Sequence, residues 1–218
     1  MKFPALPTLQ TKLPIQSFID QWIKPLADAL KTLKSSLEGI SKKGQIEKEL
    51  KASRVLALAA PKDVRIRLRI AELSFLKRDL PSAVHMYREV AEIYASESLP
   101  MKAIDACLNV LRLSPTDTET NEKLGALYRE VGMIEEALQQ FEIAFYAYRS
   151  RLEHDKALAM CEAMIALSPT PTYRRKLAET HQAMGRTDEA LGEFEAIAND
   201  YRKHKQLEPL LEIYKILS

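Results

Sequence analysis

The stretch that decides the fold is written twice in the chain, as LPMKAIDACLNVLRLSPTD at residues 99–117 and as EHDKALAMCEAMIALSPTP at residues 153–171. In both copies a Lys-Ala pair is followed by a cysteine four residues after the alanine, and a Leu-Ser-Pro sequence comes near the end. The two cysteines, Cys107 and Cys161, set the interval between the copies, 161 − 107 = 54. Proline lacks the N–H that would continue a helix, so each copy is predicted to be a helix that ends before its proline.

A second pattern follows the same interval, an alanine with an aromatic residue four positions later. It occurs three times, as Ala83–Tyr87, Ala137–Phe141 and Ala190–Phe194. Three tyrosines, Tyr94, Tyr148 and Tyr201, recur at this interval to within one position. A long internal period is typical of arrays in which each unit covers its neighbour. The sequence therefore predicts a unit of about 54 residues that recurs from about residue 63 to the end.

Each unit is predicted to contain three helices. In the second unit they are expected at about 118–131, 134–151 and 153–168, because apolar residues in each range recur at helical spacing. Thr118 is the expected N-cap of the first helix, and Gly132 is its expected exit.

The second unit resembles the tetratricopeptide repeat (TPR) family. In NEKLGALY, residues 121–128, the Leu, Gly and Tyr match the family's W-x2-L-G-x2-Y pattern, although asparagine replaces the tryptophan. Ala137 and Phe141 then match the second helix of the motif, and the other two units match more loosely. The resemblance covers about residues 63–218 and implies an all-α fold, an antiparallel helical solenoid that forms a right-handed superhelix.

One departure from the family concerns the middle helix. The family commonly places a proline about twelve residues after the small alanine of the second helix, but Arg149 stands there after Ala137. The middle helices also carry a second copy of the first-helix spacing, as in Tyr87, Val90, Ala91 and Tyr94. We therefore expect each middle helix to be both the second helix of one TPR-like pair and the first helix of the next.

The region before the array is predicted to contain an extended tail at 1–13 and N-terminal helices at 14–62, with Pro25 as a kink or break. These helices are interpreted either as a cap or as a degenerate fourth repeat, because Pro61 precedes Pro115 by the interval of the repeat. Two further interpretations stay open, a dimerisation element and a helix that lies on a membrane surface.

The last predicted helix, LEPLLEIYKILS, has an apolar stripe made of Leu207, Leu210, Leu211, Tyr214 and Leu217. An uncovered stripe of this kind predicts a neighbour, either further repeats in a longer protein or a second copy of the chain. The alternative is that the stripe packs back on Tyr201 and its helix.

The segment at 64–70, VRIRLRI, alternates in a way that would suit a strand. Its position in the repeat predicts a helix instead. On a helix Arg65 and Arg69 share a face, where each could bind a carboxylate or pair within its own helix.

Composition narrows the function. The chain has 218 residues, with 32 basic and 30 acidic side chains, which argues against a general nucleic-acid binder. No stretch has the length of a membrane span, and residues 1–14 do not form a signal peptide. The two cysteines are interpreted as buried free thiols, which fits a cytoplasmic protein. No motif of an enzyme, a metal site or a cofactor site is found.

These observations predict a non-enzymatic scaffold that binds a protein or peptide segment, acidic or amphipathic, in a groove lined by the first helices. A structural spacer or dimerisation module is the alternative, with self-association through the N-terminal helices or the C-terminal helix. Chaperone-tail binding is doubtful, because the asparagines of the carboxylate-clamp TPR type are missing. The groove-facing residues implied by the resemblance are Arg65, Arg69, Glu72, Glu119, Glu122, Lys123, Thr172, Arg175, Lys176 and Glu179.

Overall fold

The computed structural model describes residues 24–217, and over this range it contains helices and turns but no strand. The described residues divide between two compact units, with the boundary between residues 52 and 53; the second is called the unit 53–218. The helices are α2 (Lys24–Ala59), α3 (Val64–Leu76), α4 (Leu80–Ser96), α5 (Pro100–Leu113), α6 (Thr118–Glu130), α7 (Ile134–Ser150), α8 (His154–Leu167), α9 (Pro171–Ala183), α10 (Thr187–Lys203) and α11 (Leu207–Leu217). The all-α prediction is confirmed, and the predicted tail at 1–13 lies outside the described residues.

The three helices predicted for the second unit are present as α6, α7 and α8, with bounds that differ from the prediction by one residue or less. The predicted cap is wrong by one position. Asp117 is the N-cap of α6, and its carboxylate accepts a hydrogen bond of 3.2 Å from the N–H of Thr120. Aspartate and threonine are both good caps, so only the backbone conformation at 117 decides between them.

The segment that alternates like a strand is helical, as its place in the repeat predicted. It forms the start of α3, which begins after Asp63. The Asp63 carboxylate accepts a hydrogen bond of 3.0 Å from the N–H of Arg65 and so caps the helix.

The turns show the repeat in the backbone. Arg78, Gly132 and Gly185 have positive φ angles at the turn between the first and middle helices, and they follow the interval of the repeat to within one position. A second set with positive φ, at the turn between the middle and closing helices, is Ser98, Leu152 and Lys205. Each unit therefore uses two turns with a left-handed residue, and the family resemblance in the sequence has a geometric counterpart.

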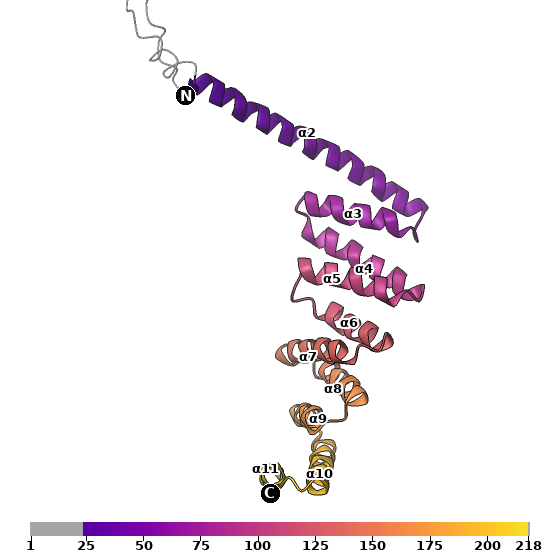
Figure 1. Ribbon diagram of the computed structural model, residues 1–218, viewed down its shortest axis with the longest axis vertical. Helices are drawn as coiled ribbons and strands as arrows, with labels where there is room; N and C mark the ends of the chain where they lie inside the picture. Colours follow the sequence, from indigo (N-terminus) through magenta and orange to yellow (C-terminus); the bar gives the residue numbers. More distant parts are fainter. Residues whose placement is uncertain (1–23, 218) are drawn as a thin grey trace, which may run out of the picture. The chain divides into compact units, whose positions relative to one another are not determined.

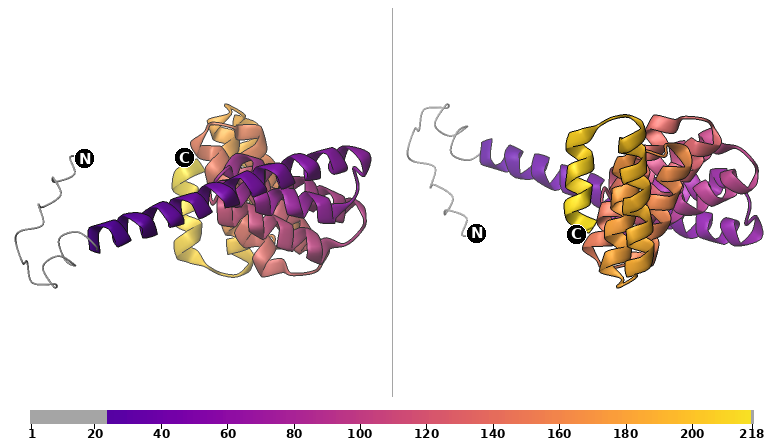
Figure 2. Two further views of the ribbon diagram at one scale, coloured as in Figure 1. Left: turned by 90° about the horizontal axis from the view of Figure 1, so that it is seen from above. Right: turned by 90° about the horizontal axis from the view of Figure 1, so that it is seen from below.

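Consecutive helices from α3 to α11 lie side by side (Figures 1 and 2). The first unit consists of α3, α4 and α5, and the second of α6, α7 and α8. In both, the middle helix packs closely on its two neighbours, whereas the α5–α6 and α8–α9 junctions between units are looser. Ala83, Ala137 and Ala190, one on each middle helix, are buried. The predicted three-helix units, with a shared middle helix, are therefore present.

One contact explains the small residue of the TPR-like motif. A methyl group added to Gly125 on α6 would lie 2.7 Å from two ring carbons of Phe141 on α7. Real Cβ atoms do not approach other atoms so closely, so only glycine lets the two helices meet at this distance.

Helix α2 runs without interruption from Lys24 to Ala59, with Pro25 in its first turn. It ends at residue 59, as α5 ends at 113 and α8 at 167, so the three ends follow the interval of the repeat. The equal spacing places the end of α2 in the register of a closing helix.

The last helix covers part of its apolar surface. Leu210 and Ile213 on α11 are buried against α10, where Tyr201 packs beside them. Leu207, Leu211 and Tyr214 remain exposed, and the side chain of Leu217 lies outside the described ones.

A candidate interaction surface

The predicted binding residues of α3 are exposed and pair locally. The Arg65 side chain is 91% exposed and forms an ion pair of 3.2 Å with Asp63. Arg69 and Glu72 form an ion pair of 3.1 Å one turn apart. These are surface pairs, which contribute little to stability and can exchange for an outside partner.

The predicted residues of α6 contact the middle helix of the preceding unit. Lys123 forms an ion pair with Glu92 of α4. Arg88 of α4 pairs with the buried carboxylate of Asp117 and lies 4.0 Å from Glu119. The start of α6 is therefore tied to α4 by charged side chains of both signs.

Glu122 contacts the middle helix of its own unit. Its carboxylate accepts a hydrogen bond of 2.6 Å from the hydroxyl of Tyr148 on α7. Burial of Tyr148, together with this hydrogen bond, raises the pKa of its hydroxyl well above the ordinary value. The ammonium of Lys156 lies 5.1 Å from the centre of the same ring, at cation–π distance.

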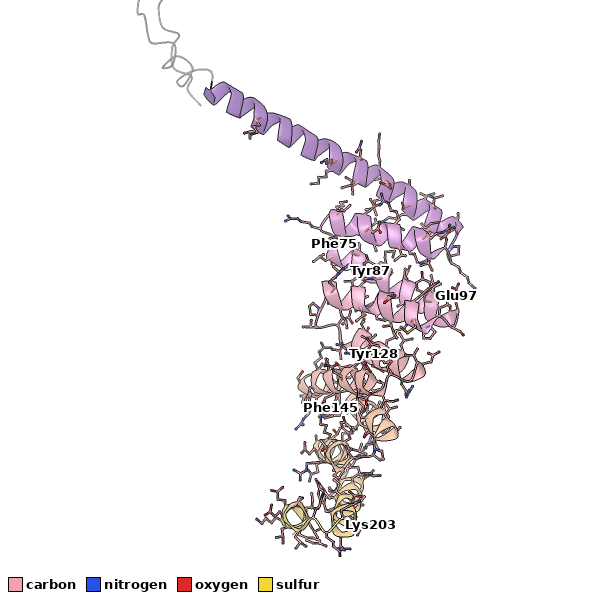
Figure 3. The ribbon with its side chains drawn as sticks, in the orientation of Figure 1. Phe75, Tyr87, Glu97, Tyr128, Phe145 and Lys203 are labelled. Carbon is pink, nitrogen blue, oxygen red and sulfur yellow. The ribbon has the colours of Figure 1, made fainter. Side chains whose placement is uncertain are left out.

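Lys176 on α9 is the most enclosed of the predicted residues, with a side chain only 11% exposed. Its ammonium pairs with Glu142 of α7 and lies 4.6 Å from the ring centre of Tyr146. Phe145 and Tyr173 complete the aromatic surroundings at 5.5 and 5.7 Å; Figure 3 labels Phe145 on α7. Burial lowers the pKa of Lys176, but the hydrogen bonds to Glu142 and Tyr146 outweigh it and raise the pKa.

The remaining predicted residues of α9 link it to two further helices. Glu179 pairs with Arg149 of α7 at 3.3 Å, and Arg175 pairs with Glu212 of α11 at 3.8 Å. Thr172, in the first turn of α9, is exposed.

These contacts follow one another from helix to helix, and we call the residues that make them the polar strip. It links α4, α6, α7, α9 and α11, and acidic side chains outnumber basic ones in it. Its residues are Arg88, Glu92, Asp117, Glu119, Glu122, Lys123, Glu142, Tyr146, Tyr148, Arg149, Arg175, Lys176, Glu179 and Glu212. Six of the predicted binding residues lie in it.

Two hollows in the first unit were not expected from the sequence. The larger, of about 610 Å³, lies between the end of α2, α3 and α4, with Leu58, Arg67 and Met86 in its lining. The smaller, of about 390 Å³, is lined by Phe75, Leu76 and other residues of α3, α4 and α5; Figure 3 labels Phe75. The signal that could have revealed the larger hollow is a departure from the repeat at residue 57, described below.

Both cysteines are buried free thiols, as the sequence predicted. Burial raises the pKa of Cys107 to about 11 and that of Cys161 to about 12. Among the described residues no group of three or more His, Cys, Asp and Glu side chains is placed to hold a metal ion. Over the same residues, none of the helices combines the length and hydrophobicity that a membrane crossing needs.

Comparison with known proteins gives no match to a protein-family model and no similar curated protein. Among solved structures, the chain is similar to residues 41-end of MamA from Desulfovibrio magneticus RS-1, with 16% identity, coverage of 71% of this chain and 96% of that one, and a TM-score of 0.37. It is similar to TPR-like repeats of a Podosopora anserina putative kinesin light chain at 15% identity, with coverage of 76% and 98% and a TM-score of 0.34. The thermophilic TPR protein TTC0263 of Thermus thermophilus is 22% identical, with coverage of 79% and 98% and a TM-score of 0.31.

At these identities and TM-scores the solved structures support no functional conclusion. The TPR-like character of the chain rests on its own packing, above all on the contact of Gly125 with Phe141 and on the repeated turns.

Proposed function

We propose that the chain is a non-enzymatic scaffold that holds a segment of a partner protein along the polar strip. The observation that carries the proposal is the continuity of the strip, which links five helices from three units.

The strip favours a partner with charges of both signs. Its basic residues already have acidic neighbours, and acidic side chains are in excess, so an entirely acidic segment would meet repulsion. The exposed pairs Arg149–Glu179 and Arg175–Glu212 can open at little cost. Tyr146, which is half exposed beside Lys176, offers an aromatic surface.

The two buried thiols fit a reducing compartment, and we include a cytoplasmic location in the proposal. The expected contribution of Arg65 and Arg69 is kept as a separate hypothesis, since these residues pair locally on α3.

A spacer or dimerisation module is the second candidate, favoured by the exposed apolar side chains of α11. Leu207 and Leu211 lie one turn apart on a helix whose other side is buried against α10. Sedimentation of the full chain over a range of concentrations tests it. A dimer that Leu211→Glu converts to a monomer would support this candidate.

The scaffold proposal is tested by photo-crosslinking in the native cells. A photoreactive amino acid at Glu119 or Glu179 in the strip should label the same polypeptide, and charge reversal by Arg175→Glu should abolish the labelling. Glu135 and Glu195 are matched exposed controls outside the strip. Equal labelling at all four positions, or none in the strip, would contradict the proposal.

A further inference from the structure

All the residues that line the larger hollow belong to the compact unit that begins at residue 53. Its walls come from the last turns of α2, from α3 and from α4, and its lining is mostly apolar, with Ala57, Leu58, Ile70, Pro81 and Met86 among the residues. A volume of about 610 Å³ lies within the range of known binding pockets, about 300–1,000 Å³. Leu58 at the rim is 84% exposed, which is unusual for so large an apolar side chain beside a hollow.

At one place in the lining of the hollow the chain departs from its own repeat. Ala57, Leu111 and Ile165 follow the interval of the repeat, so they occupy the same place in three successive closing helices. Leu111 and Ile165 pack against the cores of their units. Alanine is the smaller side chain at this place, so it leaves open space that a leucine or isoleucine would occupy.

One residue of the lining, Arg67, holds a buried hydrogen-bond donor without an acceptor. Arg67 donates from Nε to Glu89 at 2.7 Å, but its Nη1 is buried without a hydrogen-bond partner in the structure. An unpaired buried donor costs free energy that an arriving acceptor would recover. The nearby carboxylates are already engaged, because Glu89 binds Arg67 and Asp79 caps α4 through the N–H of Ser82.

The rim adds one cationic side chain, Arg54, and the imidazole of His85. Arg54 and His85 line the hollow, and His85 lies 3.7 Å from Glu89. With Glu89 paired to Arg67, the hollow presents apolar walls beside the guanidinium groups of Arg54 and Arg67, which is complementary to an apolar side chain next to an acidic one.

We infer that this hollow is a docking site for an acidic amphipathic helix of a partner protein, whose leucine side chains enter the space left by Ala57 while a carboxylate accepts from Arg67. The inference rests on the proposed scaffold function and gives it a second, separate contact. The helix-in-groove mode places apolar anchors at i, i+4 and i+7, which suits a hollow bordered by three helices.

The test uses the full chain and a fluorescein-labelled twelve-residue peptide with leucines at i, i+4 and i+7 and glutamates elsewhere, measured by fluorescence anisotropy. Two further probes replace either the glutamates by lysine or the leucines by serine. The glutamate–leucine peptide should bind about tenfold or more tightly than both, since each lost interaction of about 1.4 kcal/mol is a factor of ten.

Ala57→Leu gives the hollow the residue that stands at the same place of the repeat in α5, Leu111, and should weaken binding of the glutamate–leucine peptide by about tenfold. Ala57→Ser is the matched control that leaves the space open and should bind like the unmodified chain. Leu58→Glu changes a rim residue that the fold leaves exposed and should also weaken binding. Arg175→Glu, in the polar strip, should have no effect, which separates this site from the scaffold test.

Three outcomes would overturn the inference. The lysine peptide could bind as tightly as the glutamate peptide, or Ala57→Leu could leave binding unchanged. The chain could also be a dimer that Ala57→Leu dissociates in sedimentation velocity, in which case the occupant is a second copy of the chain.

Discussion

Replacing Gly125 by alanine tests the packing on which the TPR-like repeat rests. The new methyl group would lie 2.7 Å from Cδ1 and Cε1 of Phe141, closer than atoms in proteins approach. Phe141 is buried in the core of the second unit, so its ring has little room to move. The two helices must therefore separate, or the ring must leave its position.

The magnitude follows from two opposing effects. Alanine is about 1 kcal/mol more favourable than glycine inside a helix, and this gain applies at Gly125 and at Gly192 alike. Overpacking a core contact costs about 1–3 kcal/mol. Gly125→Ala is therefore expected to lower the free energy of unfolding by up to about 2 kcal/mol. Gly192 in α10 has no atom within 4 Å of an added Cβ, so Gly192→Ala should stabilise the chain.

Urea unfolding of both variants, followed by circular dichroism, measures the difference. The two unfolding free energies should differ by about 1–3 kcal/mol, the cost of the clash alone. In a double-mutant cycle, Phe141→Leu should remove most of the penalty of Gly125→Ala, because the ring that the methyl group meets is gone. If Gly125→Ala stabilised the chain as much as Gly192→Ala does, the proposed close contact of α6 and α7 would be refuted.

Further expectations concern the core, the thiols and a turn. Ala137→Leu should overpack the centre of the second unit and lower the unfolding free energy by about 1–3 kcal/mol, and an unchanged melting temperature would contradict this. Cys107 and Cys161, whose pKa values are raised to about 11 and about 12, should resist a thiol reagent at pH 8 until urea unfolds the chain. The unfolded thiols lose their protons at lower pH than the buried ones. Their contribution to the free energy of unfolding should therefore be complete below pH 9 and fall as the pH rises from 9 to about 12; a thiol that reacts rapidly in the folded chain would contradict its burial. Leu152→Gly should leave stability unchanged or raise it by up to about 1 kcal/mol, because Leu152 has φ +60° at an exposed turn, and a clear loss in calorimetry would contradict the strain there.

The sequence was sufficient to predict the helices and their period. The alternation of VRIRLRI was outweighed by its place in the repeat, and that segment is helical. The repeat predicts the helices because each unit buries a small residue at the same place, as at Ala83 and Ala137. Local rules gave the wrong cap at Thr118, since two neighbouring residues could both cap and the tertiary position of the turn selects Asp117.

The sequence patterns could not predict the contacts of the candidate surface. Lys176 and Glu142 are 34 residues apart, and Arg149 and Glu179 are 30 apart. Each pair joins the middle helix of one unit to the first helix of the next, and the residue types at these places vary between units. The assignment of groove-facing positions could therefore identify exposed first-helix residues but could not show that several of them already have partners.

The arrangement of contacts predicts which helices a local destabilisation affects. The closest packing is between consecutive helices, and the junctions α5–α6 and α8–α9 are looser than the contacts inside the first two units. In an array of this kind, stability is nearly a sum of unit and nearest-neighbour contributions. The clash at Gly125 should therefore increase amide hydrogen exchange first in α6 and α7, while α10 keeps its protection. A uniform increase from α3 to α11 would mean that the unit 53–218 unfolds as one cooperative body, and the three-helix unit would then describe its packing but not its energetics.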